Sequence, residues 1–137
     1  MGRILSIDYG AKRSGIAATD PLRIIASPVT ALETQHLIEF LTSYFQQETV
    51  DEVVVGWPTQ DDGSPTNNTP LVQAFVNRFK KLFPNMPVVL HDEWNTSNMA
   101  MSAMIAGGLK KKDRRNKLTI DKVSAVLILQ SYLNSKI

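Results

Sequence analysis

The chain of 137 residues is 43% hydrophobic and 20% charged, which is typical of a folded globular protein and excludes a disordered or fibrous one. It contains no cysteine, so disulfide bonds and thiolate metal sites are excluded as well. The net charge of +2 is too small to indicate a nucleic-acid partner by itself. No apolar stretch approaches the roughly 20 residues of a membrane span, and no leader precedes the first strand. We therefore expect a single cytoplasmic domain over residues 1–137 that binds no membrane.

The first third of the chain predicts three strands and a helix. The strands are short apolar runs at residues 4–7, 15–18 and 24–29. The connections between them are short enough for hairpins, and Pro28 places the third strand at the edge of the sheet because proline cannot donate a ladder hydrogen bond. Apolar residues at helical spacing then predict a helix over 37–45, with Thr34 as its N-cap.

The remainder of the chain alternates short β-branched strands with helical segments. In chain order, these are a strand at 53–55, a polar loop at 57–69, a helix at 71–82, a strand at 88–90, a helix at 97–106, a basic loop at 109–117 and a helix at 120–133. The last helix is apolar almost all round, which indicates that it packs into the body of the protein.

This order of elements predicts an α/β fold with a five-stranded mixed sheet, in which an antiparallel meander is followed by parallel strands. The first, fourth and fifth strands run parallel, and helices cover both faces of the sheet. In sheets of this kind, sites form at the carboxyl ends of the parallel strands. Side chains that follow those strands are therefore the candidates for chemistry.

Four acids are expected at this edge of the sheet. Asp8 follows the first strand, Asp92 and Glu93 follow the last strand, and Asp121 lies in the first turn of the final helix with Thr119 as N-cap. Taken singly, each acid has a structural explanation as a turn residue, a solvated strand end or a helix N-terminal acid. Clustered carboxylates repel one another unless a hard cation lies between them. Their coincidence therefore favours a site for Mg²⁺ or Mn²⁺, where two ions would cut a phosphodiester.

Basic and aromatic residues flank these acids. The candidate contacts to nucleic acid are Lys12, Arg13, Trp94, Lys110, Lys111, Lys112, Arg114 and Arg115. Trp57 also follows a predicted strand, and each tryptophan is a candidate for stacking on a base, with core packing as the alternative. His91 adjoins the acids and is interpreted as a structural histidine.

An Asp-x-Gly turn followed by a hairpin also begins the actin and sugar-kinase type of ATPase. Those enzymes close two lobes on the nucleotide, whereas 137 residues supply only one. The chain also lacks the glycine-rich motifs of phosphate loops and dinucleotide-binding folds. A single lobe with acids at the sheet edge is instead the ribonuclease H-like arrangement.

Four segments, in family order along the chain, resemble the bacterial YqgF (RuvX-like) family. They are residues 8–17, residues 54–58 with the turn at 62–63, residues 91–93 with Thr96 and Ala100, and residues 120–133. The resemblance implies a ribonuclease H-like fold and a metal-dependent nuclease that trims the 5′ end of the 16S rRNA precursor. By position it makes Asp8, Asp121 and one of the pair Asp92 and Glu93 the metal ligands, and we expect Asp8, Glu93 and Asp121 to be catalytic.

Two alternative functions stay open. Members of the family are also described as Holliday junction resolvases, and a resolvase would act on branched DNA as a homodimer. The family has an arginine where this chain has Trp94, and indole cannot grip a phosphate as arginine does. A second alternative is therefore an RNA-binding assembly factor with weakened catalysis. The expected partners are precursor rRNA or branched DNA and ribosomal or pre-ribosomal particles, with the chain as a monomer or a homodimer.

Overall fold

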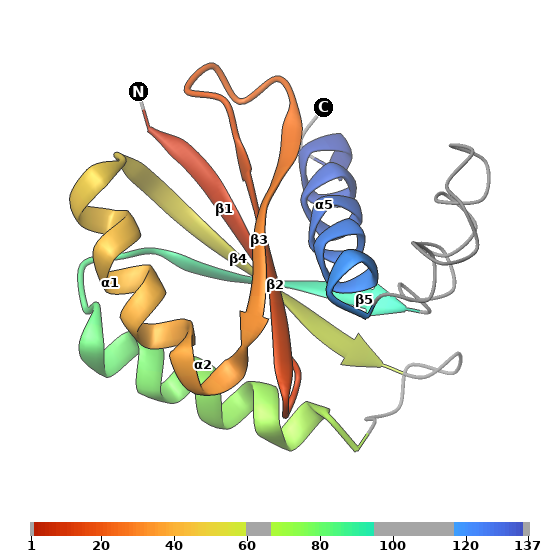
Figure 1. Ribbon diagram of the computed structural model, residues 1–137. Coiled ribbons are helices and arrows are strands. Elements are labelled where there is room, and N and C mark those ends of the chain that lie inside the picture. The colour runs from red at the N-terminus through yellow and green to blue at the C-terminus, as the bar shows by residue number, and fades with distance from the viewer. Residues whose placement is uncertain (1, 60–66, 95–116, 136–137) are drawn as a thin grey trace.

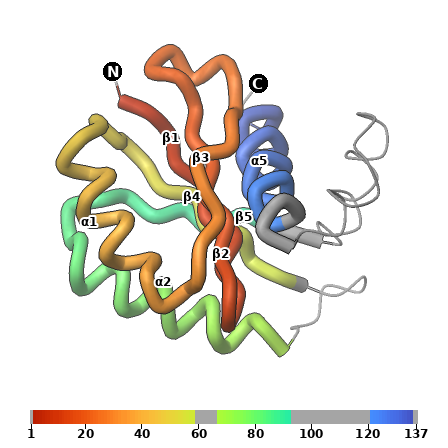
Figure 2. The backbone as a smooth tube through the Cα atoms, in the orientation of Figure 1, coloured from red at the N-terminus to blue at the C-terminus, as the bar shows by residue number. Residues whose placement is uncertain are grey.

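The computed structural model in Figures 1 and 2 describes residues 2–59, 67–94 and 117–135. At residues 59, 93–94 and 117–120 it describes the backbone alone. The elements in chain order are β1 (Arg3–Asp8), β2 (Arg13–Thr19), β3 (Ala26–Glu33), the 3₁₀ turn η1 (Thr34–His36), α1 (Leu37–Gln47), β4 (Val50–Thr59), α2 (Thr69–Leu82), β5 (Val88–Trp94) and α5 (Lys117–Ser135). Within these ranges, no helix combines the length and the apolar character needed to cross a membrane.

The strands form one mixed sheet of five strands in the order β3-β2-β1-β4-β5. β2 pairs antiparallel with β1 and with β3, whereas β1, β4 and β5 run parallel. Ile7 pairs with Val55, and Val55 pairs with Leu90, so the three parallel strands end at the same edge of the sheet. The predicted five-stranded sheet and its parallel strands are confirmed.

Helices cover both faces of the sheet, as Figure 1 shows, with α1 and α2 on one side and α5 on the other. Successive side chains of a strand point to opposite faces, and the core divides accordingly. Leu5 and Ile7 belong to the cluster that packs against α1 and α2, while Ile4 belongs to the cluster that packs against α5. Because both faces of the central strands β1 and β4 are buried, these two strands read as apolar runs.

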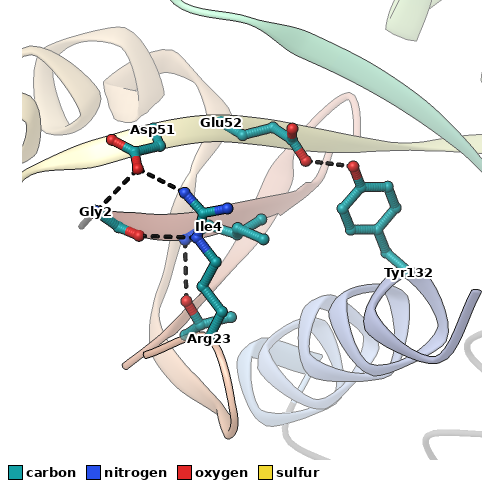
Figure 3. Close-up of polar contacts among 7 residues, drawn as sticks. Gly2, Ile4, Arg23, Asp51, Glu52 and Tyr132 are labelled. Carbon is teal, nitrogen blue, oxygen red and sulfur yellow. Dashed lines mark hydrogen bonds and ion pairs between the residues drawn. The ribbon is translucent and has the colours of Figure 1, made fainter. Parts of the chain in front are cut away.

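Helix α5 is fixed to the sheet by contacts along its length. Near its start, the backbone of Asp121 lies so close to Gly15 that a Cβ on Gly15 would be 2.1 Å from the Asp121 carbonyl oxygen. In its middle, the buried Ser6 hydroxyl donates to the carbonyl of Ala125 at 2.7 Å. Near its end, the Tyr132 hydroxyl donates to Glu52 of β4 (Figure 3). These contacts leave the helix little freedom to slide, which fixes the height of Asp121 over the sheet.

Figure 3 also shows how the start of β1 is held, at the end of this strand away from Asp8. The Asp51 carboxylate accepts hydrogen bonds from the Gly2 backbone N–H and from the Arg23 guanidinium. The bond from Gly2, together with Arg23, lowers the pKa of Asp51 below its ordinary value. The N-terminal strand and the β2–β3 turn are thereby tied to β4.

The strands are longer than their apolar runs predict. β4 continues to Thr59 and β5 to Trp94, so residues 57–59 are in a strand and not in the predicted loop. Asp8 likewise ends β1 and does not follow it. Trp57 is half-buried against the core under α1 and α2, so the alternative of core packing is correct for it. Ladder hydrogen bonds carry each strand past its last buried apolar residue, which hydrophobicity cannot indicate.

Two predicted N-caps, Thr34 and Thr119, are wrong, and other predictions lie outside the described residues. Thr34 opens η1, and its hydroxyl donates to the Gly10 carbonyl instead of capping the helix. α5 begins at Lys117, so Thr119 is inside it and Asp121 lies beyond its first turn. The expected helix at 97–106 lies outside the described residues. So does the basic loop, apart from Lys117, which belongs to α5.

We predict that Gly15→Ala destabilises the protein. Alanine in a strand is ordinarily the more stable residue, but here its Cβ would clash with the Asp121 carbonyl and displace α5. The expected loss is about 1–3 kcal/mol in the free energy of unfolding, as for other overpacked cores. Chemical denaturation measures it, and an unchanged or raised stability would contradict the close approach.

Candidate functional site

A pocket of about 400 Å³ opens at the edge where the parallel strands end. Its lining comes from the end of β1 and the following turn, from the start of α2 and from α5. The lining residues are Asp8, Tyr9, Gly10, Ala11, Lys12, Arg13, Asn68 and Asp121. The structure thus brings together two of the four predicted acids and both basic residues of the turn.

Gly15 allows Asp8 and Asp121 to line the same pocket. Asp8 is the register partner of Gly15 across the β1–β2 pair, and the backbone of Asp121 rests on Gly15. A residue with a Cβ at position 15 would hold α5 away from the sheet. The absence of a side chain there lets a helix residue more than 100 positions away line the same pocket as the strand acid.

Arg13 forms an ion pair with Asp121, with its Nε 3.3 Å from Oδ2. The side chains of Arg13 and Asp121 are 35% and 21% exposed, so solvent screens the pair and its contribution to stability is small. Its importance is the placement of charge, because the guanidinium is held at the rim of the pocket beside a carboxylate. An arginine there is positioned to bind an anion that approaches the acids.

The start of α2 supplies two polar residues that the sequence analysis missed. The Asn68 side-chain amide donates to the Tyr9 carbonyl at 2.8 Å, and the buried Thr69 hydroxyl donates to the Pro58 carbonyl at 2.8 Å. Figure 2 shows the start of α2 beside the turn between β1 and β2. The available signal was the run Asn-Asn-Thr-Pro at 67–70, which is typical of a helix start.

The acids of β5 are separated by the alternation of the strand. His91 lies on the α5 face, because its Nε2 is 2.8 Å from the Ser131 hydroxyl and its ring packs edge-on against Tyr132. This contact agrees with a structural role for His91. Asp92 is the next residue along the strand, so it belongs to the opposite face from the one where Asp8 and Asp121 line the pocket. Its side chain is exposed. Positions 91 and 93 of β5 share one face.

The remaining predicted contacts lie outside what the structure describes. These are the side chains of Glu93 and Trp94 and the residues Lys110, Lys111, Lys112, Arg114 and Arg115. Among the described residues, no group of three or more His, Asp or Glu side chains is close enough to hold a metal ion. The pocket has two carboxylates, Asp8 and Asp121, and this pair of oxygen donors fits a hard divalent cation that takes its other ligands elsewhere.

Comparison with known proteins agrees with this architecture. A family model for RuvX, described as Holliday junction resolvase, matches residues 2–135. A protein of Flavobacterium johnsoniae named for pre-16S rRNA nuclease activity is 49% identical over 136 residues, which cover 99% of each chain.

Two solved structures share the fold. The fowlpox virus resolvase in complex with Holliday junction DNA has a TM-score of 0.61 at 12% identity, covering 98% of this chain and 99% of that one. The RuvC protein of T. thermophilus in complex with a Holliday junction substrate has a TM-score of 0.56 at 13% identity, covering 98% of this chain and 95% of that one. Identities this low show the fold alone, and the predicted ribonuclease H-like architecture is confirmed.

Proposed function

The chain belongs to the RuvX family, and from this premise we propose that it is a metal-dependent nuclease that hydrolyses a phosphodiester bond of the 16S rRNA precursor. The observation that carries the proposal is the pocket at the edge of the parallel strands, which Asp8, Asp121, Lys12 and Arg13 all line. Such a reaction requires acidic residues that bind cations and basic residues that bind phosphate. The near-full-length relative named for pre-16S rRNA nuclease activity supports the choice of substrate.

Asp8, Asp121 and Glu93 are the proposed ligands of two divalent cations, Mg²⁺ or Mn²⁺. Glu93 is preferred to Asp92 because position 93 shares the β5 face of His91, whose ring contacts α5, whereas Asp92 belongs to the other face. When bound, the cations would activate a water for attack and stabilise the charge on the leaving oxygen.

The other residues of the pocket bind and orient the substrate. The Arg13 guanidinium has N–H donors beyond the Nε that contacts Asp121, and these are proposed to grip a phosphate next to the scissile bond. Lys12, exposed in the same turn, adds positive charge at the rim. The basic residues Lys110, Lys111, Lys112, Arg114 and Arg115 are also proposed to bind phosphates. Trp94 is proposed to stack on a nucleobase.

A second candidate function is cleavage of branched DNA. It is favoured by the description of the matching family model as Holliday junction resolvase. A resolvase has to cut two strands symmetrically, so this function requires a homodimer. The main proposal sets no such requirement, because it needs only one RNA strand to be cut.

We predict that Asp8→Asn abolishes Mg²⁺-dependent cleavage of a precursor 16S RNA fragment while the protein stays folded. Loss of an outer-shell partner alone typically costs 10–100-fold, so loss of a ligand should reduce cleavage by more than roughly 100-fold. Glu39→Gln, in the exposed face of α1, is the control for a neutralised carboxylate and should cleave as the wild type does. Retained cleavage by pure Asp8→Asn protein would contradict the mechanism.

The same assay separates the candidate functions. Precursor RNA and a four-way DNA junction are offered to the wild-type protein with Mg²⁺ and with EDTA, and the solution mass is measured alongside. Cleavage of the RNA in Mg²⁺ supports the main proposal, whereas symmetrical cleavage of the junction by a dimer supports the resolvase. Binding of RNA that persists in EDTA with no cleavage in Mg²⁺ would identify an assembly factor and contradict both nuclease functions.

Arg13→Gln should weaken RNA binding in a salt-dependent way. If Arg13 contacts one phosphate, the slope of log affinity against log salt concentration should fall by about 1. Arg78→Gln removes the same charge from the exposed face of α2, away from the pocket, and should leave the slope unchanged. Fluorescence anisotropy across a salt series measures both variants, and equal slopes for Arg13→Gln and the wild type would show that Arg13 binds no phosphate.

A further inference from the structure

The hydroxyl groups of Ser14 and Thr34 form hydrogen bonds that hold the turn between β1 and β2. The Thr34 hydroxyl donates to the Gly10 carbonyl at 2.6 Å, and the Thr34 backbone N–H donates to the Lys12 carbonyl at 2.9 Å. The Ser14 and Thr34 hydroxyl oxygens are 2.8 Å apart, and the Gly10 backbone N–H donates to the Ser14 hydroxyl at 3.4 Å. Thr34 therefore reaches back 24 residues to hold the chain just after Asp8.

The donors and acceptors of this network have one consistent arrangement. The Gly10 carbonyl only accepts, so the single Thr34 hydroxyl proton is committed to it. The Ser14 hydroxyl must then donate to Thr34, which leaves the Ser14 oxygen to accept from the Gly10 N–H. Both polar groups of Gly10 are thus satisfied in a closed ring. We refer to Ser14 and Thr34 as the hydroxyl clasp.

The clasp lies on the opposite side of the sheet from the carboxylates. Ser14 is fully buried and precedes Ile16 by two positions, and Ile16 packs under α1 and α2. Arg13, one position earlier, belongs to the α5 face and contacts Asp121 there. Neither clasp hydroxyl is among the groups that line the pocket, so the clasp acts through the turn and not by touching a ligand.

The turn depends on this support because two of its sides face pockets and not packed side chains. Ala11, Lys12 and Arg13 line the pocket that contains the acids, and they also line a second pocket of about 570 Å³ toward the end of β3. Side-chain packing on those two sides cannot fix the turn. Tyr9 is held separately, by the Asn68 amide and by stacking on Phe75, so the clasp is what fixes the stretch from Gly10 to Lys12.

We infer that Ser14 and Thr34 are positioning residues of the proposed nuclease site, which hold Lys12 and Arg13 in place over Asp8 and Asp121. The inference rests on the proposed function and adds to it the reason why the phosphate-binding turn keeps one conformation. A displacement of about 1 Å in a residue that orients substrate can cost roughly 100-fold in rate. Loss of the clasp should therefore impair catalysis more than it impairs folding.

The test compares Thr34→Val with Thr34→Ser. Valine keeps the shape of threonine and removes the hydroxyl, whereas serine keeps the hydroxyl. We expect Thr34→Val to lower kcat for cleavage of the precursor RNA by at least roughly tenfold, with a smaller change in KM, and to reduce the salt slope of RNA binding by about 1. Thr34→Ser should restore both to near wild-type values. Ser14→Ala should reproduce the valine effect from the other half of the clasp.

Thr19→Val is the matched control for a merely structural role. Thr19 is buried at the end of β2, five residues after Ser14. Its hydroxyl oxygen accepts a hydrogen bond from the Ile4 backbone N–H at 3.0 Å. Thermal unfolding should show a similar loss of stability for Thr19→Val and Thr34→Val, with catalysis and salt slope altered only in the latter.

The outcomes separate this inference from the proposed function. If the wild-type protein cleaves the RNA, and Thr34→Val and Thr34→Ser have the same kcat and salt slope as the wild type, the role of the clasp is overturned. The nuclease proposal would then still stand. A wild-type protein that binds the RNA but does not cleave it in Mg²⁺ would overturn both. Equal losses of activity in Thr19→Val and Thr34→Val would show that the clasp is structural only.

Discussion

The close approach of α5 to β2 at Gly15 is the constraint on which the candidate site depends. A Cβ at this position would be 2.1 Å from the Asp121 carbonyl oxygen, so only glycine lets the helix lie this low on the sheet. Gly15 is also the register partner of Asp8, and the contact therefore brings the strand acid and the helix acid to the same pocket. The hydrogen bonds of Ala125 and Tyr132 to the sheet hold the rest of the helix in that position. A backbone contact thus determines which side chains can act together.

Much of the fold could be predicted from the sequence, because apolar runs and helical spacing report burial directly. The order of the described elements, the mixed sheet and the helices on both of its faces followed from these patterns. The boundaries did not, since Trp57 and Asp92 extend strands that hydrophobicity ends too early. Thr34 is instructive, because a threonine before a helix favours an N-cap locally, whereas its true partner is a carbonyl 24 residues away. A tertiary contact of this kind leaves no local signal.

The candidate site was predictable to a similar degree. The rule that sites form where parallel strands end was sufficient to predict that Asp8 and Asp121 line one site. Lys12 and Arg13 lie in the turn after Asp8 and were predicted with it. The contact between Arg13 and Asp121, the role of Asn68 and the hydroxyl clasp were not predictable, because each joins segments whose approach depends on the packed fold. The structure also distinguishes the two acids of β5, which are adjacent in sequence but belong to opposite faces. Glu93 is proposed as a ligand on that geometric ground.

The central claim is that Asp8 and Asp121 hold divalent cations for phosphodiester cleavage. The most direct measurement is a crystal structure of the protein grown with Mn²⁺, examined for anomalous scattering. The account predicts a Mn²⁺ peak at roughly 2.1 Å from carboxylate oxygens of both Asp8 and Asp121, with Glu93 completing the site. A map with no Mn²⁺ peak between these carboxylates at saturating metal, or with the ion bound elsewhere, would contradict it.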